Sequence, residues 1–467
     1  MSTPGAGPRP GEAMHRFDAA TADLAAQVLR RARERLQLDP VPLDAPRSPA
    51  ELTAAAGQTI TAAGLGGQAA LDLFCDVLAP ACLSTDHPRY LSFIPCAATE
   101  AATLFDLVVG ASSVYGGSWL EGAGAVYAEN QALRWIADLA GLPAGAGGVF
   151  VPGGTTGNLS ALLAARSAVR AREGHRRPLK VAAAATAHSS IASTCDVLDL
   201  QVVPVPVDAR TGRLTGAALT AALGTDRSDL AAVVATAGST NLGTVDDIAS
   251  VADYCHAPDT AGTPPTWLHV DGAYGGAGLA APTVRHLFTG TERADSFIVD
   301  PHKWLFAPFD SCALLYRDPA TARAAHTQRA SYLDVLTERG EWDPADYAIG
   351  LTRRARGLPF WFSLAAHGAD AYTAAVERTL QVARAAAAMV AGRAELQLVR
   401  EPDLSVVAFF RRGWATADYT AWSERLLAEQ FAFVVPSAHE GRTCLRLAIV
   451  NPRTGEDDIA AVLDTLR

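Results

Sequence analysis

Short apolar runs alternate with longer stretches of helical periodicity through the middle of the chain. Runs of four to eight apolar residues are typical of strands buried on both faces, and alternation with helices favours parallel pairing. We therefore expect a mainly parallel sheet between helices, from about residue 91 to 365. The runs are rich in Val, Ile and Ala and lie at Val181–Thr186, Ala231–Thr236, Trp267–Val270, Phe297–Val299 and Ala313–Tyr316.

The two ends of the chain follow different patterns. Helical spacing runs from Phe17 to about Leu36 and again from about Gln68 to Leu83, which predicts a helical N-terminal segment over residues 1–90. A small α+β C-terminal domain is predicted over residues 366–467. Its expected elements are a helix from about Tyr372 to Gly392, strands at Ser405–Arg411 and Thr443–Val450, and a helix after Thr454.

Composition narrows the class of function. Of 467 residues, 49% are apolar and the net charge is −10, which fits a folded protein and argues against a nucleic-acid partner. Seven dispersed cysteines without a C-x-x-C pair indicate reduced thiols in the cytoplasm, with no disulfide frame and no metal site. No signal peptide or membrane span is expected, because uncharged stretches fall short of the ~18 residues a spanning helix needs.

Lysine is nearly absent from this chain. Only Lys180 and Lys303 are lysine among 39 basic residues. Arginine cannot replace lysine where an amine must lose its proton and attack a carbonyl. Lys180 opens an apolar run, as an exposed residue at a strand start does, so Lys303 is the candidate for chemistry.

Reactive residue types follow three of the predicted strands. His188 comes after Val181–Thr186, Asp271 ends a strand, and Lys303 follows Phe297–Val299. Each alone has an ordinary structural explanation, as a hydrogen-bonded histidine, a helix cap or a surface lysine. Because ligand sites of open α/β sheets lie at the carboxyl ends of strands, the three are expected to converge on one crevice.

A turn rich in glycine and threonine, residues 153–158, precedes a predicted helix. Such a turn offers backbone N–H groups and the positive end of a helix dipole to a phosphate, although many glycine turns merely cap a helix. An amine, a carboxylate for a pyridinium proton and a phosphate-binding helix end are together what a pyridoxal 5′-phosphate (PLP) enzyme needs.

The motifs and their order resemble the group II PLP-dependent decarboxylases, especially the aromatic-L-amino-acid decarboxylase branch. The resemblance extends from about Phe17 to the C-terminus. It is carried by Gly153-Gly154-Thr155 with Asn158, Ala187-His188-Ser189-Ser190, Thr236-Ala237-Gly238-Ser239-Thr240, His269-Val270-Asp271-Gly272-Ala273-Tyr274, Ala294-Asp295-Ser296-Phe297, Asp300-Pro301-His302-Lys303-Trp304, Arg353-Arg354-Ala355-Arg356 and Cys444-Leu445-Arg446-Leu447-Ala448-Ile449.

The resemblance implies fold-type-I architecture in an obligate homodimer, with the active site at the subunit interface. Lys303 would form the imine with the cofactor, Asp271 would pair with the pyridinium nitrogen, and His188 would stack on the ring. The remaining implied contacts are Gly154, Thr155, Asp300 and His302 around the phosphate and Thr240 near the ring. Animal enzymes of the family more often have Asn where Asp300 stands, and an aspartate beside a phosphate dianion is unfavourable.

The segment expected to decide the reaction departs from the family. Its decarboxylases deliver a tyrosine on a mobile loop to protonate Cα, but Asp334–Asp346 contains no tyrosine. Tyr332 and Tyr347 flank this loop and are the candidates, either as proton donors or as structural aromatics. Gly117, where aromatic-substrate enzymes carry a larger residue, is expected to leave room for a non-aromatic or larger substrate.

The sequence therefore predicts a PLP-dependent lyase that acts on an L-amino acid or an amino-acid conjugate and removes its carboxylate. Three alternatives stay open: decarboxylation with oxidative deamination to an aldehyde, β-elimination as in C–S lyases, and a silent scaffold. A scaffold would be expected to lose Lys303 or Asp271, and both are present.

Overall fold

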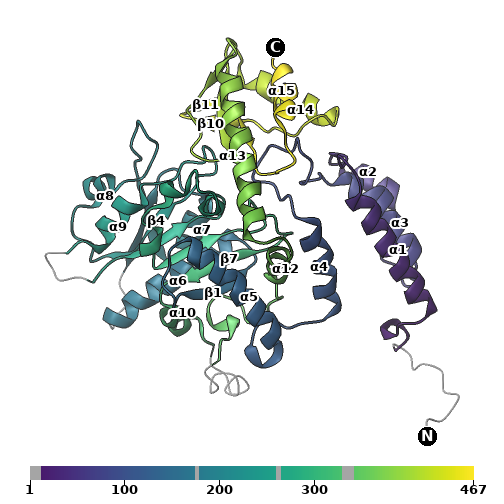
Figure 1. The fold of residues 1–467 in the computed structure, drawn as a ribbon, viewed down its shortest axis with the longest axis horizontal. Helices are drawn as coiled ribbons and strands as arrows, with labels where there is room; N and C mark the ends of the chain where they lie inside the picture. Colours follow the sequence, from purple (N-terminus) through teal and green to yellow (C-terminus); the bar gives the residue numbers. More distant parts are fainter. Residues whose placement is uncertain (1–11, 174–177, 259–263, 329–340) are drawn as a thin grey trace, which may run out of the picture.

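A seven-stranded sheet forms the centre of the computed structural model, which describes residues 12–173, 178–258, 264–328 and 341–467 (Figure 1). The strand order is β1-β7-β6-β5-β4-β2-β3. Neighbours from β3 to β6 pair in parallel, whereas β7 is antiparallel to both β6 and β1. The strands are β1 (Gly147–Val151), β2 (Leu179–Ala184), β3 (Leu200–Val205), β4 (Leu230–Thr236), β5 (Trp267–Asp271), β6 (Ser296–Val299) and β7 (Cys312–Tyr316).

Helices cover both faces of this sheet, because successive residues of each buried strand point to opposite sides. On one face Val233 and Val270 pack in a core with residues of α5, α8 and α9. On the other, Val234 packs with residues of α6 and α7, and Ile298 packs with residues of α6 and α10. The expected parallel sheet between helices is confirmed. The helices are α5 (Trp119–Leu139), α6 (Gly154–Glu173), α7 (Ser189–Val197), α8 (Gly216–Leu223), α9 (Ile248–His256) and α10 (Pro319–His326).

A second, antiparallel sheet of order β10-β11-β9-β8 lies in the C-terminal part of the chain. Helix α13 runs from the large sheet to this small sheet, as Figure 1 shows, and contacts α12 as well as β8 and β9. The elements are α12 (Leu358–His367), α13 (Ala369–Ala391), β8 (Leu396–Leu398), β9 (Val406–Arg411), α14 (Thr416–Ala428), β10 (Ser437–His439), β11 (Arg442–Ala448) and α15 (Glu456–Asp464).

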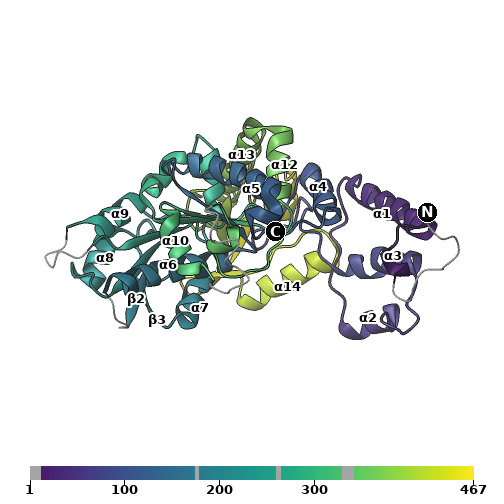
Figure 2. The same cartoon turned by 90° about the horizontal axis from the view of Figure 1, so that it is seen from below.

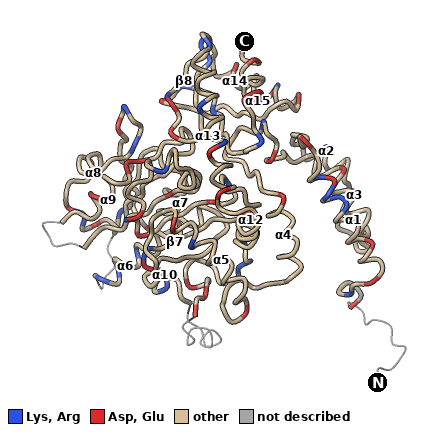
Figure 3. Tube along the Cα trace, in the orientation of Figure 1, with Lys and Arg blue, Asp and Glu red and all other residues tan. Residues whose placement is uncertain are grey.

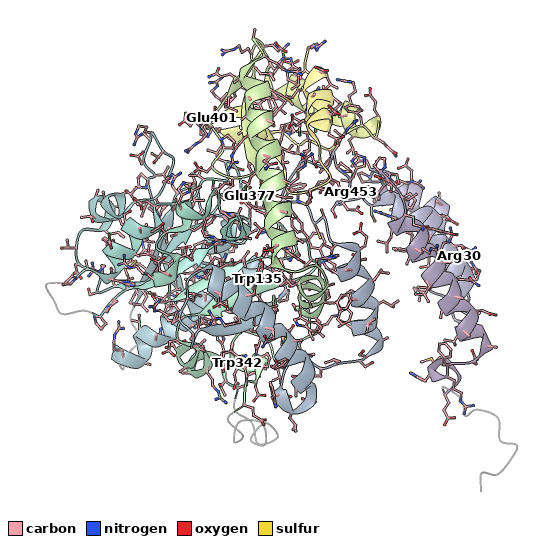
Figure 4. The ribbon with its side chains drawn as sticks, in the orientation of Figure 1. Arg30, Trp135, Trp342, Glu377, Glu401 and Arg453 are labelled. Carbon is pink, nitrogen blue, oxygen red and sulfur yellow. The ribbon has the colours of Figure 1, made fainter. Side chains whose placement is uncertain are left out.

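The N-terminal arm, residues 12–81, lies to one side of the remaining chain in both views (Figures 1 and 2). None of its helices contains a buried residue. Arg453, labelled in Figure 4 between the small sheet and the arm, forms an ion pair with Asp39. The arm comprises α1 (Ala19–Leu36), α2 (Pro49–Ala56), α3 (Gly67–Leu73), the π-helix η2 (Phe74–Leu78) and the 3-10 helix η3 (Ala79–Ala81).

Charged residues of both signs are interspersed along the trace in Figure 3. Within the four described ranges, no helix combines the length and apolar character needed to cross a membrane.

Candidate active site

A cavity of about 380 Å³ opens at the carboxyl ends of the central parallel strands. Thr236 is the last residue of β4, Asp271 is the last residue of β5, and Lys303 follows β6. The structure thus brings together residues far apart in sequence, as expected where parallel strands end at one edge. All eight residues predicted to contact a cofactor line this cavity: Gly154, Thr155, His188, Thr240, Asp271, Asp300, His302 and Lys303.

Lys303 ends in an ion pair with Asp300. Its Nζ lies 2.8 Å from Asp300 Oδ2, and the Asp300 side chain is only 1% exposed. Burial lowers the pKa of Lys303, but the charge of Asp300 and the hydrogen bond to it outweigh burial, so the net pKa lies above the ordinary value. In the chain alone, Lys303 is therefore an ammonium at neutral pH and must lose a proton before its nitrogen can attack a carbonyl.

Asp271 is 6% exposed at the floor of the cavity. Its Oδ1 accepts a hydrogen bond from the Ala273 N–H at 3.1 Å, and its Oδ2 accepts one from Asn158 Nδ2 at 3.0 Å. A carboxylate has about four acceptor positions, so two hydrogen bonds leave capacity for a donor from the cavity. A protonated pyridine nitrogen is such a donor.

His188 caps the N-terminus of α7. Its Nδ1 accepts a hydrogen bond from the Ser190 N–H at 3.2 Å and lies 2.9 Å from the Ser190 hydroxyl. With Nδ1 occupied by these partners, the imidazole is held at the wall of the cavity.

The glycine turn leads directly into the 20-residue helix α6, which begins at Gly154. A Cβ at Gly154 would lie 3.1 Å from Ala273 Cβ and 3.2 Å from Asp300 Oδ2, so this turn has little space for a side chain. The unpaired N–H groups of the first helical turn suit a phosphate. Asp300 adds a negative charge at the same place, with His302 Nε2 3.6 Å away, and burial lowers the pKa of His302.

These residues fit PLP. The cavity holds an amine for the aldehyde, a buried carboxylate with free acceptor capacity, and a helix N-terminus for the phosphate. Beside the start of α6, the charge of Asp300 opposes a phosphate.

Sequence reasoning did not assign roles to Asn158 and Ser190, which also line the cavity. The sequence signals were the motifs in which Asn158 and Ser190 stand and, for Asn158, a polar residue on the apolar side of α6, where it is 1% exposed. Phe93 and Ile94 contribute apolar side chains to the same lining.

Of the two tyrosines that flank the expected loop, the structure describes only Tyr347. Tyr332 lies outside the described residues. Tyr347 is 4% exposed, stacks on Trp342 with 4.1 Å between ring centroids, and does not line the cavity. Its place is therefore in the core beside Ile298 and Leu314. Figure 4 labels Trp342 on the side of the large sheet away from the small sheet.

Gly117 does not open extra room within this chain. A Cβ there would lie 2.3 Å from the hydroxyl oxygen of Tyr115, which donates to the Leu351 carbonyl at 2.7 Å. The expectation of free space at Gly117 is corrected, because the Tyr115 side chain fills it.

A mainly parallel sheet between helices, with a lysine amine, an acceptor carboxylate and a helix N-terminus around one cavity, is the arrangement of a PLP-dependent enzyme of fold type I. The chain belongs to the pyridoxal-dependent decarboxylase family, since the pyridoxal-dependent decarboxylase conserved domain matches residues 68–412. It is thus an amino-acid decarboxylase-like lyase with PLP as its cofactor.

Curated relatives agree with this assignment. The chain is 34% identical over 394 residues to L-2,4-diaminobutyrate decarboxylase of Rhizobium meliloti, covering 81% of this chain and 77% of the relative. It is 28% identical over 393 residues to aromatic-L-amino-acid decarboxylase of Bacillus atrophaeus, covering 81% and 80%. A crystal structure of Oryza sativa TDC with PLP and tryptamine superposes with a TM-score of 0.87, at 25% identity over 97% of this chain and 99% of that one.

Proposed function

We propose that this enzyme removes the α-carboxylate of an L-amino acid, with PLP held covalently on Lys303. The observation that carries the proposal is the convergence of Lys303, Asp271 and the start of α6 on one cavity. When bound, the cofactor accepts the electron pair left on Cα as carbon dioxide departs.

Each lining residue has a defined task in this proposal. With PLP bound, Asp271 would accept the hydrogen of the ring nitrogen and keep it protonated. His188 would cover the ring face. The backbone N–H groups at Gly154 and Thr155, with His302, would hold the phosphate, and Thr240, which also lines the cavity, would contact the ring. Lys303, the one amine in the cavity, captures the cofactor after losing its proton to the adjacent Asp300 or to water.

The proposal extends to a homodimer with the active site at the subunit interface. Apolar side chains stand exposed on α4 (Glu100–Ala111) and α5: Leu104 and Leu107 are 52% and 51% exposed, and Tyr127 is 61% exposed. In the N-terminal arm, Leu29 and Phe74 are 52% and 56% exposed. A second copy covering these faces would remove them from water, and burial of apolar surface drives such association.

We place the enzyme in the cytoplasm. All seven cysteines are free thiols, and five of them are buried, which supports a reducing compartment.

A second candidate reaction is decarboxylation followed by oxidation of the amine carbon by dioxygen, which is reduced to hydrogen peroxide, while water displaces ammonia and leaves an aldehyde. Tyr347 supports it, since this tyrosine packs in the core and offers no proton within its own chain. Burial raises the pKa of Tyr347 to about 12, so its hydroxyl stays protonated at neutral pH. Replacing Tyr347 by Phe should leave product identity and kcat unchanged. A large fall in kcat without loss of stability would reinstate Tyr347 as the proton donor.

The covalent attachment has a sharp test because the chain has only two lysines. Borohydride reduction of the reconstituted enzyme should fix the cofactor on the peptide that contains Lys303. Lys303→Ala should lose the visible absorbance of bound cofactor, whereas Lys180→Ala, which breaks only the 2.5 Å ion pair with Asp229, should keep it. A colourless wild type, or labelling at Lys180, contradicts the proposal.

The reaction is tested with a panel of L-amino acids. Amine and carbon dioxide in equal amounts support decarboxylation. Aldehyde with peroxide and ammonia supports the second candidate, and ammonia without carbon dioxide indicates β-elimination.

A further inference from the structure

A line of polar side chains, buried for most of its length, runs behind the cavity, from Trp267 to Asp271. Trp267 Nε1 lies 2.8 Å from Ser296 Oγ, which lies 2.8 Å from His269 Nδ1. His269 Nε2 lies 2.8 Å from Asn158 Oδ1, and Asn158 Nδ2 lies 3.0 Å from Asp271 Oδ2. We call these five residues the buried relay. His269 and Ser296 are 0% and 1% exposed and do not line the cavity.

The Asp271 end of the buried relay sets the direction of its hydrogen bonds. The ionised carboxylate of Asp271 can only accept, so an Asn158 N–H points to it and the Asn158 oxygen faces His269 Nε2. His269 therefore carries its hydrogen on Nε2 and, as a neutral imidazole, accepts at Nδ1 from the Ser296 hydroxyl. The indole N–H of Trp267 can only donate, and Ser296 accepts it.

The protonation state of His269 agrees with this direction. Burial lowers the pKa of His269 to about 4, even though the charge of Asp271 opposes that shift. A neutral imidazole has one donor and one acceptor nitrogen, as the middle of a directed line requires.

Asn158 is also linked to His188, the residue proposed to stack on the cofactor ring, through Ser190. Its other N–H lies 2.9 Å from Ser190 Oγ, so the Ser190 hydroxyl hydrogen is free to point to His188 Nδ1 at 2.9 Å. Because Nδ1 accepts, His188 carries its hydrogen on Nε2.

We propose that Asn158 is a positioning residue whose amide, held by His269, Ser296 and Trp267, orients Asp271 and His188 toward the cofactor. The inference rests on the roles proposed for Asp271 and His188. Both N–H groups of Asn158 are committed, one to each branch, so a single side chain couples the pyridinium partner to the ring-stacking histidine. Loss of the Asn158 amide would leave Asp271 Oδ2 without its donor.

The direction of the buried relay can be measured in the wild-type protein, with and without cofactor. In protein labelled with ¹⁵N-histidine, the signals that disappear in His269→Gln belong to His269. The relay requires the tautomer of His269 with hydrogen on Nε2, and an Nδ1–H tautomer would overturn it. This measurement does not depend on which reaction the enzyme performs.

Cofactor affinity tests the positioning role. Asn158→Leu keeps the size but removes the donors, and the dissociation constant of PLP should rise about tenfold or more, since hydrogen bonds to charged groups are the strong ones. Ser296→Ala, a smaller change remote from the cavity, should raise the dissociation constant less. Ser160→Ala is the matched control, because this buried α6 hydroxyl accepts from the Ile349 N–H instead.

The outcomes separate the two proposals. Equal weakening by Asn158→Leu and Ser160→Ala would assign Asn158 a purely structural role and overturn the inference. Unchanged affinity in both Asn158→Leu and Ser296→Ala would overturn it as well. A wild-type protein that binds no PLP would instead contradict the proposed function.

Discussion

Asp300 places a carboxylate beside both the amine of Lys303 and the first turn of α6. The charge raises the pKa of Lys303, and the same charge repels a phosphate at the helix end. Both effects oppose cofactor capture, although Asp300 Oδ2 also lies 2.8 Å from the Lys303 nitrogen, which must release a proton.

Replacing Asp300 by Asn should therefore speed capture of PLP. Without the charge the pKa of Lys303 falls, and each unit of decrease raises the neutral fraction about tenfold at a pH well below that pKa. In the wild type, the capture rate should rise with pH from 7 to 9, because the neutral amine becomes more abundant as pH approaches the raised pKa. Stopped-flow absorbance after mixing with PLP measures both effects. Slower capture by Asp300→Asn would show that proton acceptance by Asp300 outweighs its charge.

For single residues, the sequence indicated which side chains stand at strand ends but not the hydrogen bonds that hold those side chains in place. His188, Asp271 and Lys303 follow recognisable strands, so their convergence could be predicted. Asn158 and Asp271 are 113 positions apart, and no local pattern reports that one donates to the other.

Helix α6 is the element that joins the phosphate end of the cavity to the sheet. It packs across β4 to β7, and Gly157 lies in close contact with the sheet. A Cβ at Gly157 would lie 2.9 Å from Ile298 Cγ2 and 3.2 Å from Cys312 Sγ.

Larger residues at Gly157 should push α6 away from the sheet. Gly157→Val should destabilise the fold by roughly 1–3 kcal/mol, as expected for overpacking, and weaken PLP binding as the helix start moves. Gly157→Ala should be milder, since alanine is favoured over glycine in a helix by about 1 kcal/mol. Thermal unfolding and PLP titration of the two variants check that the Val variant is affected more than the Ala variant. A Val variant as stable as the wild type would contradict this packing.

The strands that the hydrophobic pattern did not reveal, β1 and β3, are the two edges of the large sheet. Interior strands are buried on both faces and therefore appear as continuous apolar runs. Strand β3 is partly exposed and contains Pro204, a residue tolerated at sheet edges, while β1 begins with two glycines. Gly148 is required there, because a Cβ would overlap the Leu314 carbonyl oxygen.

At the level of the whole molecule, the N-terminal arm shows that a hydrophobic pattern in the sequence does not always lead to burial within the same chain. The arm has helical periodicity in the sequence but buries none of its helical residues against its own chain. An apolar stripe on a helix predicts that this face packs against other side chains. It does not tell whether those side chains belong to the same chain or to a second copy.

A charge on α4 should dissociate the proposed dimer. Leu107→Arg places a cation on an exposed apolar face, and sedimentation should then give a mass near that of one 48.8 kDa chain, with activity falling in parallel. Val197→Arg is the control, because Val197 is 71% exposed on α7, outside the faces assigned to the interface. A wild type that sediments as a single chain, or an unaltered mass for Leu107→Arg, would argue against this interface.

The scarcity of lysine has a chemical consequence beyond catalysis. Reactive aldehydes condense with exposed side-chain amines, and this protein offers them only Lys180, already paired with Asp229, outside the cavity. Excess cofactor should thus attach to side chains mainly at Lys303, since Lys180 is the one other side-chain amine in the sequence. If the enzyme released an aldehyde product, that product would find almost no amine on the enzyme's surface with which to cross-link or inactivate its own source.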